Sequence, residues 1–83
     1  MDTRYDPGAS TRATAVAAAE QLKAGTWESV EALAVLALSA KGTPDAAALL
    51  ARAASTADGL RPGNWESVRA LALLSRAQTE LRG

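Results

Sequence analysis

A six-residue stretch occurs twice in this chain, first as Gly25-Thr26-Trp27-Glu28-Ser29-Val30 and again as Gly63-Asn64-Trp65-Glu66-Ser67-Val68. The second tryptophan follows the first by 38 residues (65 − 27), and the same offset aligns the neighbouring positions. From Leu22 to Leu36, ten of the fifteen positions are identical in the second copy. A period of this length is typical of a two-helix repeat, so the sequence predicts one duplicated helix pair and four helices.

Each copy of the repeated stretch has the features of a helix start. Thr26 and Asn64 are residue types that accept hydrogen bonds from the free amides of a first turn. The glutamate after each tryptophan would lie in that first turn, where its charge opposes the helix dipole. We therefore expect helices that begin at Trp27 and Trp65, and the first of them should run to about Ala40.

The helix before Trp27 is expected to begin at Ser10 or Thr11, since either side chain can cap the amides of a first turn. Its predicted end is Ala24, because the following Gly25 suits the left-handed conformation found after many helices. Residues 1–9 show no apolar periodicity and contain a turn-forming Pro-Gly pair. We expect them to form a flexible N-terminal arm.

The helix before Trp65 is expected to be capped by Thr43. Pro44 would then occupy the first helical position, where its missing amide costs nothing. Small and apolar side chains continue at helical spacing from there to Ala57, after which Asp and Gly interrupt the pattern. This helix should therefore end near Ala57.

The two repeats are predicted to form one all-α domain over residues 10–83, built from two tandem αα-hairpins that form a four-helix array or bundle. Repeat one would span about 10–42 and repeat two about 43–83. From Val30 to Ala40 the second helix is apolar on nearly every side, which is typical of a helix covered on more than one face. The corresponding sector of the last helix is polar, so we expect the second helix at the centre and a solvated side on the last.

The charge and residue composition narrow the classes of function. Nine Lys and Arg balance nine Asp and Glu, so no net field attracts nucleic acid or anionic lipid. The chain has no Cys and no His, which removes disulfides, the commonest metal ligand and the usual general base near neutrality. We therefore predict a protein that is not an enzyme, needs no cofactor and binds neither a metal nor nucleic acid.

Targeting signals are not evident in the sequence. The longest mainly apolar run, residues 32–40, is much shorter than the roughly 20 residues that a membrane span needs. The first six residues lack the basic and then apolar order of a signal peptide. We therefore expect a cytoplasmic bacterial protein that has no membrane partner.

The Ala- and Leu-rich run from Ala51 to Leu74, together with its partner in the first repeat, carries a family resemblance. It resembles the helix-pair repeats of bacterial tetratricopeptide-like and HEAT-like proteins, and the likeness covers about residues 13–77. The resemblance implies a role in binding protein or peptide rather than catalysis.

The two tryptophans are the strongest candidate binding residues, because Trp is enriched at the energetic centres of interfaces. As anchors related by the repeat they could line a groove or a two-fold interface. Alternatively, each could pack back onto the end of the preceding helix. Two arginines beside the second tryptophan could receive an acidic partner, unless nearby glutamates neutralise them. The predicted protein-binding residues are Trp27, Glu31, Trp65, Arg69 and Arg76.

The preferred function is a non-catalytic interaction module that binds a partner protein or peptide, or a second copy as a homodimer, through the Trp-bearing helix starts. One alternative is a small regulator or immunity-type inhibitor of one specific enzyme. A second alternative is a structural component that assembles with itself. An enzyme with a pocket between the repeats would need a buried polar cluster, and the sequence shows none.

Overall fold

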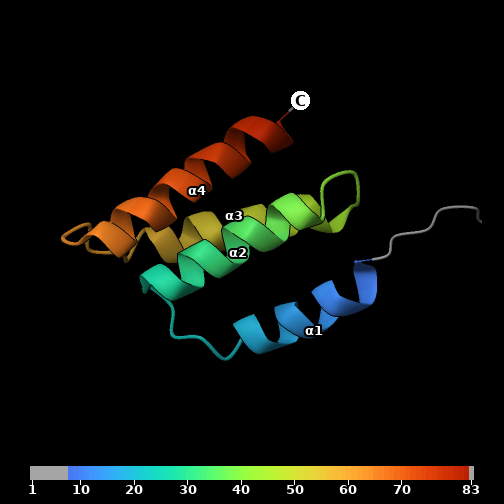
Figure 1. Ribbon diagram of the computed structural model, residues 1–83, viewed down its shortest axis with the longest axis horizontal. Coiled ribbons are helices and arrows are strands. Elements are labelled where there is room, and N and C mark those ends of the chain that lie inside the picture. Colours follow the sequence, from blue (N-terminus) through green and yellow to red (C-terminus); the bar gives the residue numbers. More distant parts are fainter. Residues whose placement is uncertain (1–7, 83) are drawn as a thin grey trace, which may run out of the picture.

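The computed structural model describes residues 8–82, and within that range the chain forms four α-helices and no strand. These are α1 (Ala9–Ala19), α2 (Trp27–Ser39), α3 (Asp45–Ala57) and α4 (Trp65–Leu81). α1 and α3 run in one direction, and α2 and α4 run in the opposite direction (Figure 1). The prediction of an all-α fold made of two tandem helix pairs is confirmed.

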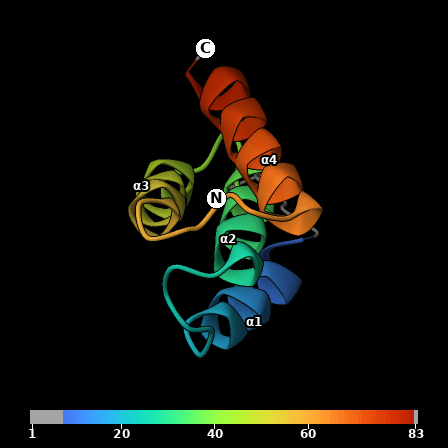
Figure 2. The ribbon, with the colours of Figure 1, turned by 90° about the vertical axis from the view of Figure 1, so that its left-hand side faces the viewer.

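The four helices form an open array with α2 at its centre. In both views α1, α2 and α4 lie in one layer, and α3 stands beside α2 on one side of that layer (Figures 1 and 2). α2 packs against all three other helices, whereas α1 packs closely only against α2 among the described helices. The predicted central position of α2 is therefore confirmed.

The apolar core is built mainly on α2. Its fully buried residues are Val30, Ala34 and Ala37. α3 and α4 add further small side chains and one leucine each to the same cluster. Alanine allows two helix backbones to approach closely but buries little apolar area, so each helix of this small domain depends on its neighbours for stability.

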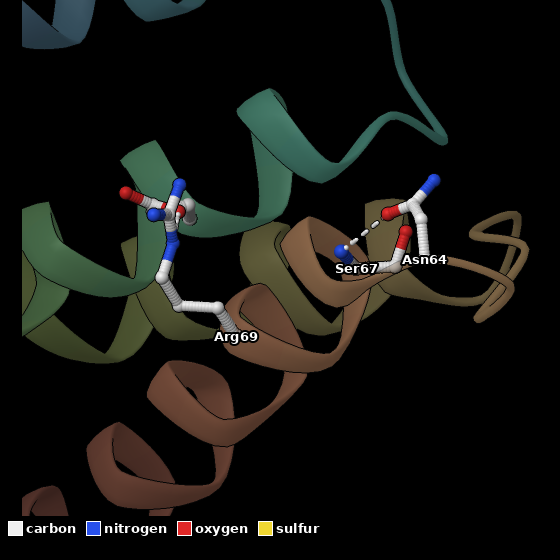
Figure 3. A network of polar contacts seen from close by, with 4 residues as sticks. Asn64, Ser67 and Arg69 are labelled. Carbon is white, nitrogen blue, oxygen red and sulfur yellow. Dashed lines mark hydrogen bonds and ion pairs between the residues drawn. The ribbon is translucent and has the colours of Figure 1, made fainter.

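The starts of α2 and α4 confirm the interpretation of the repeated stretch. The Thr26 hydroxyl oxygen accepts the Ser29 amide hydrogen, with an N···O distance of 3.2 Å. Asn64 Oδ1 accepts the Ser67 amide hydrogen at 2.8 Å, as Figure 3 shows. Each side chain satisfies one of the amides that a helix start leaves without a partner in the helix.

The predicted limits of α1 are wrong at both ends. The helix begins at Ala9, before the expected start at Ser10 or Thr11, and its N-cap is Gly8, which makes no side-chain capping bond. It ends at Ala19 instead of Ala24, because the chain then tightens into turns that end at Leu22. Since Ala9 is helical, the expected arm does not reach residue 9, and the rest of that prediction, residues 1–7, lies outside the described part of the chain.

The Thr56 hydroxyl of α3 makes hydrogen bonds to the end of the α1–α2 loop and to the first turn of α2. Ser29 Oγ donates to the Thr26 carbonyl at 2.8 Å, so its oxygen accepts the hydrogen of the Thr56 hydroxyl at 2.7 Å. Thr56 Oγ1 in turn accepts the Gly25 amide hydrogen at 2.6 Å. Gly25 has a φ of +82°, a left-handed conformation that glycine adopts without strain. The Gly25 amide therefore bonds to α3 and not to a carbonyl of α1, so the helix does not extend to Ala24 as expected.

The start of α3 differs from the prediction by one residue. Pro44 is the N-cap and Asp45 is the first helical residue. The Thr43 hydroxyl still accepts the Asp45 amide hydrogen, at 3.3 Å, so the expected capping side chain acts from one position further out. The end of α3 at Ala57 is as predicted.

Arg12 attaches α1 to the far end of α2. Its side chain is buried, and its Nη1 donates to the Ser39 carbonyl at 3.1 Å. The last carbonyls of a helix have no partner within the helix and carry the negative end of its dipole. A cation from α1 therefore satisfies the C-terminal end of α2.

None of the four helices in the described part of the chain has both the length and the apolar character that crossing a membrane requires.

Candidate protein-binding site

Four of the five predicted binding residues meet between the starts of α2 and α4. The Arg69 guanidinium carbon lies 4.5 Å from the centre of the Trp65 ring and 5.4 Å from that of the Trp27 ring. Arg69 Nε donates to Glu31 Oε1 at 2.9 Å. Figure 3 shows the Arg69 side chain reaching from α4 toward α2. We call these residues, Trp27, Glu31, Trp65 and Arg69, the Trp–Arg cluster.

The repeat explains why this cluster forms. Glu31 and Arg69 are 38 residues apart, so they occupy the same position in the two repeats. α2 and α4 run in the same direction and pack together, which places equivalent positions opposite each other. Identical charges would repel there, but the second repeat has Arg where the first has Glu. The pair is part-exposed, so we expect about 0.2–1 kcal/mol from the ion pair and roughly 0.5–1 kcal/mol from each ring contact.

The two tryptophans differ in exposure although their positions in the repeats are equivalent. Trp27 is half-buried and packs against the core cluster. Trp65 is 63% exposed, the largest exposed fraction among the large apolar residues that the structure describes. The alternative in which each ring packs back onto the preceding helix therefore does not describe Trp65.

An apolar groove adjoins the Trp–Arg cluster. It has a volume of about 580 Å³ and lies between α1 and α2, with Trp27 and Glu31 among the residues that line it. Its walls also include Ala15, Ala18, Leu22, Ala32, Val35 and Leu36. Leu22 and Val35 are exposed by 40% and 47%. We call it the α1/α2 groove. It shares Trp27 and Glu31 with the Trp–Arg cluster, so the groove and the cluster form one continuous surface.

Arg76 does not join this surface. It lies two helical turns beyond Arg69, about 10 Å along the axis of α4. Its Nε donates to Glu80 Oε2 at 2.6 Å. This hydrogen bond holds the pKa of the Glu80 carboxyl below its usual value and raises that of the Arg76 guanidinium. Both arginines of the predicted acidic-partner site are therefore paired within the chain, Arg76 with Glu80 and Arg69 with Glu31.

The groove residues of α1 were missed by the analysis of the sequence. Small alanines such as Ala15 and Ala18 are not among the predicted binding residues, since nothing local distinguishes them from core alanines. The repeat relates them to residues of α3, but only the structure shows that the two sets differ in burial. Their counterparts, Ala53 and Thr56, are buried, while Ala18 is exposed and Ala15 is only part-buried.

The fold and this surface define a small protein of two tandem helix pairs with an apolar groove at its first repeat. Comparison with protein-family models, curated proteins and solved structures gave no match. Within residues 8–82, no group of three or more His, Cys, Asp or Glu side chains lies together in a way that could hold a metal ion.

Proposed function

We propose that this chain is a non-catalytic protein-binding module that uses the Trp–Arg cluster and the α1/α2 groove. The observation that carries the proposal is the Trp65 ring, which is 63% exposed and held 4.5 Å from the Arg69 guanidinium beside an apolar groove. A tryptophan ring has a large apolar area, and covering it with a partner is strongly favourable. Trp and Arg are also the residues most enriched at the energetic centres of interfaces.

The arrangement around Trp65 reduces the cost of binding. Arg69 is held by Glu31 and lies against both tryptophan rings, so the Trp65 ring has a support before a partner arrives. A side chain that is already ordered loses less conformational entropy on binding. The hydrogen bond to Glu31 uses Arg69 Nε, and the guanidinium carries further N–H donors for a carbonyl or carboxylate of the partner. An apolar helix with a few polar groups fits this surface.

The test is affinity capture from cells that encode the chain, with wild type, Trp65→Ala and the control Ala51→Arg. Ala51 is exposed on α3 and lines neither the groove nor the cluster. We expect Trp65→Ala to weaken partner binding roughly 30-fold, the effect of losing about 2 kcal/mol at an interface hot spot. Circular dichroism should show that both variants remain helical. Partners captured equally by wild type and Trp65→Ala would refute the proposed surface.

A cytoplasmic bacterial protein without a nucleic-acid or membrane partner remains part of this proposal. Its support is the equal number of acidic and basic residues and the absence of cysteine, which leaves no disulfide to stabilise so small a domain outside the cell. An adaptor role is consistent with a module of this size. A regulator that inhibits one enzyme would use the same surface and would appear as an enzyme among the captured partners.

A further inference from the structure

The α1/α2 groove has a counterpart in the second repeat that is already filled. The offset of 38 residues relates groove residues to buried residues of α3 and α4: Ala15 to Ala53, Ala32 to Ala70, and Leu36 to Leu74. Two further counterparts of groove residues bind α2 directly. Thr56, the counterpart of Ala18, hydrogen-bonds Ser29, and Arg69, the counterpart of Glu31, pairs with Glu31 itself. The groove between α3 and α4 is therefore occupied by α2.

α4 carries the surface that would fill the equivalent groove of the first repeat. α2 is fully buried at Val30, Ala34 and Ala37, and the counterparts of these residues on α4 are Val68, Ala72 and Ser75. All three counterparts are exposed, Val68 by 58%. Residues three or four apart lie on one face of a helix, so they form a single stripe, which we call the α4 ridge. Within residues 8–82, the first repeat thus has an open groove and the second has an exposed ridge.

The charges at the two surfaces are compatible. Within one chain, α2 is the helix that lies in the α3/α4 groove. Its Glu31 pairs there with Arg69, which is a residue of that groove. If α4 of one copy filled the groove of another, Arg69 would be the inserted residue and Glu31 the groove residue. The two would again have opposite charges. Like charges at these positions would have opposed the contact.

The unequal tryptophans fit the same scheme. Trp27, at the start of α2, is half-buried and packs against the core cluster. Trp65 is the equivalent residue at the start of α4, and it is the one left 63% exposed. α4 packs on α2, and Trp27 at the start of α2 is half-buried. If a further helix packed on α4 in the same way, it would cover Trp65 to a similar extent.

We infer that the α4 ridge of one copy packs into the α1/α2 groove of a second copy, so that the helix pairs continue from chain to chain. This inference rests on the proposed function and names a second copy as the partner of that surface. The contact joins two different surfaces, so it is heterologous and leaves one groove and one ridge open at the ends. Copies would add head to tail, and the mean mass in solution would rise with concentration.

Three matched substitutions test this arrangement. Ala18→Arg blocks the groove, Ala72→Arg blocks the ridge, and Ala51→Arg is a control on α3. All three alanines are exposed on helices, and Arg is a good helix former, so each variant should fold, as circular dichroism would verify. The mass is measured by light scattering after size exclusion. At protein concentrations up to about 1 mM, this detects self-association with a Kd of about 1 mM or below.

We expect wild type and Ala51→Arg to grow in mass with concentration, and each blocked variant alone to stay monomeric. An equal mixture of Ala18→Arg and Ala72→Arg should form dimers and nothing larger. The first variant keeps its ridge and the second keeps its groove, so they can make one contact only. In a symmetric dimer both copies contribute the same surface, so mixing Ala18→Arg with Ala72→Arg would not restore it.

Wild type that stays monomeric up to about 1 mM would overturn the inference, as would blocked variants that remain monomeric when mixed while wild type associates. Self-association that survives either single substitution would also overturn it. The proposed function is decided separately, because a monomeric protein whose partners are lost with Trp65→Ala still binds a foreign protein through the same surface. A protein that associates head to tail and captures no other partner would identify the second copy as the partner.

Discussion

Replacing Val30 and Val68 by alanine compares one side chain at equivalent positions of the two repeats. Val30 is fully buried in α2, and Val68 is 58% exposed on α4. Both follow the same Trp-Glu-Ser sequence in the first turn of a helix, so the local backbone effects should be equal. The difference between the two variants therefore measures what the tertiary structure does to an identical local sequence.

The expected size follows from burial. Val→Ala removes two carbons, worth about 0.8 kcal/mol each when fully buried, and the cavity left behind adds to this cost. The better helix propensity of alanine returns up to roughly 0.5 kcal/mol at either site. We expect Val30→Ala to lower the free energy of unfolding by about 2 kcal/mol. For Val68→Ala the smaller lost burial and the propensity gain nearly cancel, so its effect should lie within about 0.5 kcal/mol of zero.

Urea denaturation followed by circular dichroism at 222 nm measures both effects, at a concentration where light scattering shows a monomer. In a thermal scan, 2 kcal/mol corresponds to a fall in Tm of about 8–16 °C for a domain of this size. Equal costs for the two variants in the monomer would refute the reasoning, because they would mean that α2 and α4 are covered alike. A cost below about 0.5 kcal/mol for Val30→Ala would refute the central position of α2.

Two further predictions concern single polar contacts. Thr56→Val keeps the side-chain shape but removes the hydroxyl that bonds to the part-buried Gly25 amide and the Ser29 hydroxyl, so the free energy of unfolding should fall by about 1–3 kcal/mol. Thr56→Ser is the control, because it keeps the hydroxyl. An equal loss of stability in both variants would contradict this account. The hydrogen bond from Arg76 lowers the pKa of Glu80, so its stabilisation is present above the usual glutamate value of about 4 and is lost as the pH falls through the lowered pKa of the folded state. Glu80→Gln should therefore be slightly less stable than wild type in urea at neutral pH and equal to it in strong acid, and a difference that persists in acid would argue against the ion pair.

The beginnings of α2 and α4 could be predicted from the sequence because they depend on contacts within one helical turn. Thr26 and Asn64 bind amides only three residues away, and such contacts form wherever the helix lies in the fold. The central place of α2 could also be predicted, since a helix that is apolar on all sides needs cover on all sides. The duplication supplied the number of helices.

The end of α1 could not be predicted in this way. Gly25 is a suitable residue to follow a helix, but its amide is bound by Thr56, which is 31 residues away in the sequence. That contact exists only once α3 has packed beside α2. The contact that keeps Gly25 out of α1 is therefore a result of packing, and no local pattern in the sequence indicates it.

The candidate site shows the same division. The sequence by itself determined that two tryptophans stand at equivalent helix starts, and that Glu in one repeat is replaced by Arg in the other. Only the packing of α2 against α4 brought Arg69 between the two rings and beside Glu31. Only the order of the helices in space left Trp65 exposed while Trp27 is covered. Two nearly identical local sequences differ in burial because, among the described helices, α2 packs against all three others, whereas α4 packs mainly against α2 and to a smaller extent against α3.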